Sequence, residues 1–125
     1  MALQAEIIAV TPFRQNCTLL WDDETREAVL TDVGGDVSFL LQELDAKNLT
    51  LTAIWLTHGH LDHAGGVVEL REHRPVPVIG PHADDEFLLQ ALPDTTAQYG
   101  FPVSPAFKPT RWLTEGETLK VGSHA

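Results

Sequence analysis

Residues 57–63, with the sequence Thr-His-Gly-His-Leu-Asp-His, constrain what this chain can fold into more than any other segment. They crowd three imidazoles and a carboxylate, all ordinary zinc ligands, directly after an apolar run. His58 and His60 are one residue apart, so in an extended or loop backbone both side chains can point to the same side and bind one ion. Their neighbours Asp62 and His63 cannot easily join them around that ion. The segment therefore predicts two incomplete metal positions, each of which needs further ligands from elsewhere.

Composition bounds the class of protein. A chain of 125 residues with 43% hydrophobic residues is long enough for one modest domain with a core, which we place at residues 1–125. The formal net charge of -10 disfavours nucleic acids and anionic membrane surfaces as partners, because both are negatively charged. No stretch approaches the roughly 20 apolar residues of a membrane helix, and the first six residues lack a basic region followed by an apolar one. We therefore expect a cytoplasmic protein.

Cys17 is the only cysteine. The chain can therefore form no internal disulfide and no thiolate zinc site, so nitrogen and oxygen must hold any metal. Because Cys17 falls within an apolar strand, we expect a buried thiol rather than a nucleophile.

The spacing of apolar residues predicts alternating strands and helices. The first helix should have Asp36 as its N-cap and Asn48 near its C-cap, whereas Pro75 should end the second. A hairpin turn is expected at residues 22–25. We expect strands at residues 4–10, 17–21, 28–31, 51–57 and 76–79, a closing pair at 111–113 and 118–121, and helices at 37–47, from 67 to before Pro75, at 83–92 and at 94–99.

The ligand cluster lies inside a β-α-β unit, between the strands expected at 51–57 and 76–79. Ligands at the carboxyl end of a sheet strand lie where open α/β sheets usually place their active sites. Two ions about 3.5–4 Å apart can hold a bridging hydroxide, lower its pKa from about 15.7 toward 7 and polarise a carbonyl or phosphoryl oxygen. This chemistry favours hydrolysis. A purely structural zinc is the competing interpretation, although closed sites more often include cysteine.

The motif His58-x-His60-x-Asp62-His63, preceded by a strand and followed by Gly-Gly, resembles the signature of the metallo-β-lactamase superfamily. Residues 32–35, Asp-Val-Gly-Gly, are similar to its Asp-Pro-Gly-Gly element, with valine in place of proline. Flanking segments at 13–20, 80–87 and 111–116 resemble small bacterial proteins similar to hydroxyacylglutathione hydrolase, or type II glyoxalase. The resemblance runs over essentially the whole chain.

This resemblance implies an α/β fold, the αβ/βα four-layer sandwich, of which the chain would be the amino-terminal αβ half. It implies a hydrolase that cleaves a glutathione thioester with a metal-bound hydroxide, using two Zn²⁺ ions per complete site, with iron or manganese as alternatives. It assigns His58 and His60 to the first metal and Asp62 and His63 to the second. Asp62 would also act in catalysis by orienting the hydroxide. Asp32, outside the ligand set, would hydrogen-bond to and steady the ligand loop.

The resemblance also implies ligands that this chain lacks. Family members continue into a second half that supplies two further histidines and a bridging aspartate, so the 125-residue chain alone would be inactive or weakly active. Other readings stay open: sulfur oxidation with one iron, hydrolysis of another ester or lactam, or an inactive half-domain. Such a half-domain would pair, through an exposed sheet face, with itself or with a complementary half.

Three other histidines are further candidate ligands. His73 fits a solvated helix face, His82 follows a strand and can approach the edge of the site, and His124 lies too near the end of the chain to hold a metal geometry. The tryptophans at 21, 55 and 112 fit the core of the sheet better than substrate stacking.

Overall fold

The sheet of this protein is mixed, with six strands in the order β1-β2-β3-β4-β5-β6. The computed structural model describes residues 3–10, 15–101, 103–114, 117, 119 and 121. The first three strands are antiparallel neighbours and the last four are parallel. The elements are β1 (Leu3–Val10), β2 (Gln15–Asp22), β3 (Glu27–Thr31), α1 (Val37–Ala46), β4 (Thr50–Trp55), α2 (Leu61–Ala64), α3 (Val67–His73), β5 (Val78–His82), η1 (Ala83–Asp85), α4 (Glu86–Gln90), α5 (Leu92–Gln98) and β6 (Arg111–Leu113).

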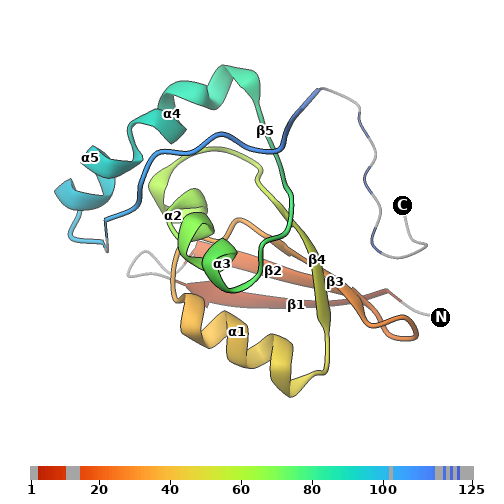
Figure 1. Cartoon of the computed structure of the whole chain (residues 1–125). Helices are drawn as coiled ribbons and strands as arrows, with labels where there is room; N and C mark the ends of the chain where they lie inside the picture. The colour runs from red at the N-terminus through yellow and green to blue at the C-terminus, as the bar shows by residue number, and fades with distance from the viewer. Residues whose placement is uncertain are drawn as a thin grey trace.

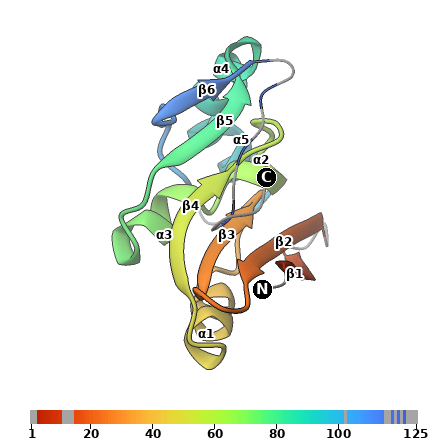
Figure 2. The same ribbon diagram turned by 90° about the vertical axis from the view of Figure 1, so that its right-hand side faces the viewer.

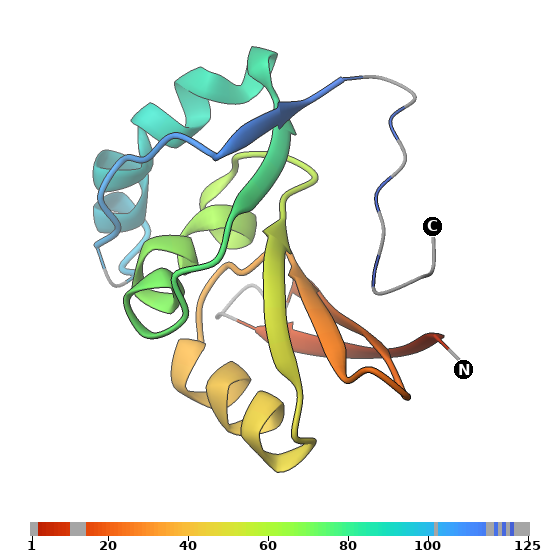
Figure 3. The same cartoon turned by 45° about the vertical axis from the view of Figure 1, so that its right-hand side comes forward.

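The helices lie on one face of the sheet, as Figures 1 and 3 show for α1, α2 and α3. Alternation along the strands explains this layer, because every second side chain points to the same face. In β1, Ile8 and Val10 are buried, whereas Ile7 is 66% exposed and Ala9 is exposed as well. The main core therefore forms between the sheet and the helices, and includes Leu19, Leu30, Leu40, Leu44, Ile54, Leu56 and Leu70.

The opposite face of the sheet carries a smaller apolar cluster. Val29 and Ala53 are buried there together with Val121, from the last part of the chain. Leu20, Trp55 and Ile79 pack around them. In Figure 2, which views the molecule from the right-hand side of Figure 1, β3 and β4 lie at the centre of the sheet. One face is thus covered by helices, and the other holds only this small cluster within the described part of the chain.

Most of the predicted elements are confirmed, with shifts at their ends. β4 stops at Trp55, two residues before the predicted end, and β5 spans Val78–His82 rather than 76–79. The helix predicted at 83–92 is divided into η1 and α4. β6 confirms the strand at 111–113, which pairs in parallel with β5; residues 118 and 120 of its predicted partner lie outside the described residues.

The first helix begins at Val37 as predicted and ends at Ala46, one residue before the predicted end, but the conformation at its start differs. Asp36 occupies the N-cap position with a left-handed backbone (φ 51°) rather than the extended conformation usual for capping residues. Asn48, just beyond the helix, is also left-handed (φ 54°), as is common where a helix ends. Among the described residues, no helix combines the length and the apolar character that crossing a bilayer requires.

Cys17 confirms the expectation of a buried thiol. It is fully buried in β2, and burial, followed by the negative charge of Asp32, raises its pKa to about 12. Since the thiolate is the reactive form, we expect a thiol reagent at about pH 8 to leave Cys17 unmodified in the folded protein. Peptide mapping should find the modification only after unfolding in denaturant. Equal labelling rates in the folded and unfolded protein would contradict the prediction.

Candidate metal centre

The loop after β4 brings the four predicted ligand side chains to the carboxyl end of the parallel strands. His58 and His60 lie on the loop, whereas Asp62 and His63 lie in the one-turn helix α2. This helix was not predicted from the sequence. It begins after His60, whose backbone carbonyl accepts hydrogen bonds from the amides of His63 and Ala64, both at 2.9 Å.

His58 and His60 approach each other through their ring nitrogens. The two Nδ1 atoms are 2.7 Å apart, and the rings are T-shaped with centroids 4.7 Å apart. For comparison, two nitrogen ligands of one tetrahedral zinc stand roughly 3.3 Å apart, given bonds of about 2.0–2.1 Å. The Nδ1 atoms of these two residues are therefore close enough together to face a single metal position.

Asp62 and His63 form the second pair. Asp62 Oδ2 lies 3.6 Å from His63 Nε2, again near the roughly 3.3 Å between two ligands of one ion. The ring centroids of His63 and His58 are 3.7 Å apart, so the two pairs adjoin. Each pair supplies two donors, and among the described residues no group of three or more His, Cys, Asp or Glu side chains is placed to hold a metal ion.

The surroundings of His58 and His63 suit metal binding. The pKa of His58 is below its usual value, first because the ring is partly buried and then because His63 and His60 would repel its positive charge. A neutral imidazole is the form that binds a metal. Nδ1 of His63 is buried, makes no hydrogen bond within the described structure, and lies 3.4 Å from Asp32 Oδ2. A carboxylate beside the second ring nitrogen is the arrangement that orients metal-binding histidines.

Asp32 also ties the ligand loop to the sheet. Its Oδ1 accepts a hydrogen bond from the Thr57 amide and its Oδ2 one from the Thr57 hydroxyl, both at 2.8 Å. The backbone of Asp32 is held in turn, because its amide donates to the Trp55 carbonyl at 2.8 Å and its carbonyl accepts from Gln15 Nε2 at 3.0 Å. The carboxylate is buried next to the residue that precedes His58, so it fixes where the loop leaves β4.

The glycines after Asp32 allow that segment to pack against α2. A Cβ added to Gly34 would lie 1.9 Å from the Asp62 carbonyl oxygen. The amide of Gly66 donates to the Val33 carbonyl at 2.9 Å, which joins the two glycine-rich segments. Both segments stand out in the sequence, but the packing of one on the other is visible only in the fold.

Two further contributors to the loop were missed. Thr57 is the partner of Asp32, and Asp85 Oδ2 accepts a hydrogen bond from the Gly59 amide at 3.2 Å. Thr57 stands directly before the motif, so its position was a usable signal. Asp85 is 26 residues away from Gly59, and no sequence pattern links Asp85 to the loop.

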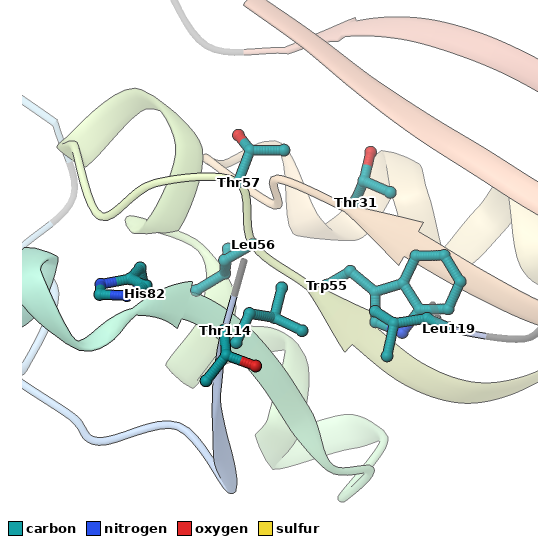
Figure 4. Close-up of a pocket in the computed structure, with 8 residues that line it drawn as sticks. Thr31, Trp55, Leu56, Thr57, His82, Thr114 and Leu119 are labelled. Atoms are coloured by element: carbon teal, nitrogen blue, oxygen red, sulfur yellow. The ribbon is translucent and has the colours of Figure 1, made fainter. Parts of the chain in front are cut away.

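A pocket of about 310 Å³ opens beside the loop at the carboxyl ends of the parallel strands. Figure 4 shows His82 on one side of it and Trp55 with Leu119 on the other. Its lining is mostly apolar, and consists of Thr31, Trp55, Leu56, Thr57, His82, Leu113, Thr114 and Leu119.

His73 and His82, the other histidines that the structure describes, join no group of three or more potential ligands. His82 lines the pocket, and its Nδ1 accepts a hydrogen bond from the Asp84 amide at 3.1 Å. His73 is exposed at the end of α3, as predicted, and His124 lies outside the described residues. The tryptophans at 21, 55 and 112 are half-buried and pack against the two apolar clusters, although Trp55 also lines the pocket.

Comparison with known proteins identifies relatives of the chain. Residues 10–125 match the model of the metallo-beta-lactamase superfamily. Over 120 residues the chain is 43% identical to hydroxyacylglutathione hydrolase GloC of Haemophilus influenzae, and the match covers 95% of this chain and 56% of that protein. The predicted resemblance to the hydroxyacylglutathione hydrolases is confirmed.

Two solved structures are also similar. The B3 metallo-beta-lactamase BLEG-1 superposes with a TM-score of 0.81 at 32% identity, over 96% of this chain and 57% of that one. TTHA1623, solved in a di-iron-bound form, gives a TM-score of 0.79 at 30% identity, over 91% of this chain and 56% of that one. The chain therefore spans about half the length of the relatives that it matches.

The fold class predicted from the sequence is confirmed as well. Helices cover one face of the sheet, so the chain is the αβ part of the predicted four-layer sandwich. The family match runs across the ligand loop and the strands on either side of it. The chain belongs to the metallo-beta-lactamase superfamily.

Proposed function

We propose that this chain forms half of the active site of a metal-dependent hydrolase that cleaves a glutathione thioester. The observation that supports it most is the convergence of two adjoining donor pairs, His58 with His60 and Asp62 with His63, at the end of β4. The name of the GloC relative supports the hydroxyacyl thioester as substrate. Because the chain spans about half of that relative, the activity belongs to the protein that also supplies the remaining ligands.

The donor set fits two divalent cations. His58 and His60 would hold one, Asp62 and His63 the other, and nitrogen and oxygen donors suit zinc, iron and manganese alike. When bound, the cations would supply activated water at neutral pH and polarise the thioester carbonyl. We propose two zinc ions, with iron as the alternative that the di-iron form of TTHA1623 favours.

The chain's own residues would orient these groups. Asp32 lies beside His63 Nδ1, and so directs the other ring nitrogen toward Asp62. The carboxylate of Asp62 is half-buried and would accept a hydrogen bond from the attacking water, which fixes its direction. The hydrogen bonds between Asp32 and Thr57 would fix the position of the ligand loop relative to the end of β4. The apolar face opposite the helices would be covered by the part that brings the remaining ligands.

A comparison of substrates tests the proposal. The protein of natural length would be loaded separately with zinc, iron and manganese, and assayed with a hydroxyacyl glutathione thioester, a β-lactam and a glutathione persulfide. We expect cleavage of the thioester to the hydroxy acid and glutathione, loss of this activity on chelation, and recovery with the native metal. Metal-loaded protein that leaves the thioester intact while it opens the lactam or consumes oxygen with the persulfide would contradict it.

A further inference from the structure

A long-range hydrogen bond reaches the backbone between His58 and His60. The amide of Gly59 donates to Asp85 Oδ2 at 3.2 Å. This amide belongs to the peptide unit that joins Gly59 to His58, so the bond restricts rotation of the backbone between the two histidines. A carboxylate that accepts from a backbone N–H forms a charge-assisted bond, which is stronger than a neutral one.

The position of Asp85 makes this contact unusual. It ends η1 and precedes α4, the N-cap position at which an aspartate commonly binds the first turn of its own helix. Here Oδ2 is directed to the loop instead. Asp85 is half-buried, whereas the side chain of its neighbour Asp84 is 91% exposed and lies 3.5 Å from His82 Nδ1.

Side chains of α4 also pack directly on Gly59. A Cβ added to this buried glycine would lie 3.1 Å from Leu88 Cβ and 3.2 Å from Leu89 Cδ2. Leu89 is fully buried and belongs to the main core. The loop is therefore confined on this side by side chains that cannot readily move, while Asp85 sets the orientation of its peptide.

We propose that Asp85 is a positioning residue that holds the His58–Gly59–His60 backbone so that the two imidazoles converge on one cation. The inference rests on the metal site proposed above. In this proposal, the Asp32–Thr57 contact holds the start of the loop and the Asp85–Gly59 contact holds its middle. Without the second contact, the peptide unit between His58 and Gly59 would lose its hydrogen bond to η1.

Three variants of the natural-length protein test this role. Asp85→Ala removes the acceptor, Asp85→Asn keeps a neutral one, and Asp84→Ala is the matched control on the exposed neighbour. We expect Asp85→Ala to weaken zinc binding about 10-fold, at the lower end of the range for lost outer partners of metal ligands. Asp85→Asn should stay within about threefold of the unsubstituted protein and Asp84→Ala should match it, because the first retains the bond and the second never made it.

Two measurements make the test specific. Zinc affinity is measured by competition with a chromophoric chelator, and exchange of the Gly59 amide is followed by NMR in the metal-free protein. Exchange should be faster in Asp85→Ala alone. If Asp85→Ala leaves the zinc affinity or the Gly59 exchange unchanged, or if Asp85→Asn is as weak as Asp85→Ala, the positioning role is overturned. Failure of the unsubstituted protein to bind zinc would overturn the proposed function as well.

Discussion

Replacing His60 with alanine is expected to weaken metal binding and thioester hydrolysis more than about 100-fold, beyond the 10–100-fold that loss of an outer partner costs. The free energy of unfolding of the metal-free protein should change by no more than about 0.5 kcal/mol, as for other surface substitutions. The reason is that the His60 side chain is exposed and faces His58 across 2.7 Å rather than the core. One proposed donor is lost while the packing is kept.

Metal content by mass spectrometry, the rate of thioester cleavage and urea unfolding of the chelated protein separate these effects. His73→Ala is the matched control, because His73 is also an exposed histidine but lies at the end of α3. It should leave all three measurements unchanged. A His60→Ala protein that retains full zinc content and activity would contradict the assignment of this residue to the metal.

Much of the fold follows from periodicity alone. The strand-helix alternation of β3, α1 and β4 could be predicted because two short runs of apolar and β-branched residues flank a segment whose apolar residues have helical spacing. The observed ends of the strands differ from the predicted ends where the local sequence pattern carries little information. β4 ends at Trp55, although Leu56 and Thr57 continue the apolar and β-branched run, because Thr57 gives its amide to the Asp32 side chain instead of to a neighbouring strand. A tertiary contact ended the strand.

The candidate site was predictable to the extent that its residues are consecutive. His58, His60, Asp62 and His63 lie within six positions, so their chemistry could be interpreted without the fold. Asp85 could not be found in the same way, because its role depends on a contact made across 26 residues. Its carboxylate would have been assigned to the cap of its own helix. Residues that support a site from another element leave no local pattern, and only their place in the fold identifies them.

Gly34→Ala should be the most damaging change outside the ligands themselves, with an expected loss of at least about 3 kcal/mol in the free energy of unfolding, at the upper end for overpacked sites. The added Cβ would lie 1.9 Å from the Asp62 carbonyl oxygen and 2.5 Å from its carbonyl carbon. Both are backbone atoms of α2, so the helix must move as a unit. That movement displaces Asp62 and His63, and the second donor pair is lost together with stability.

Gly100→Ala provides the contrast, because among the described residues other than its chain neighbours no atom lies within 4 Å of its added Cβ, and its backbone is left-handed (φ 74°). Its cost should be about 1 kcal/mol, the usual penalty for a non-glycine residue in that conformation. Urea unfolding of both variants, without metal, measures the two costs. Equal costs would show that α2 yields to the new methyl group, and the close approach of Gly34 to Asp62 would then not be what fixes the second donor pair. A larger cost for Gly34→Ala, accompanied by loss of zinc binding in that variant alone, is the result that the packing of residues 32–35 on α2 requires.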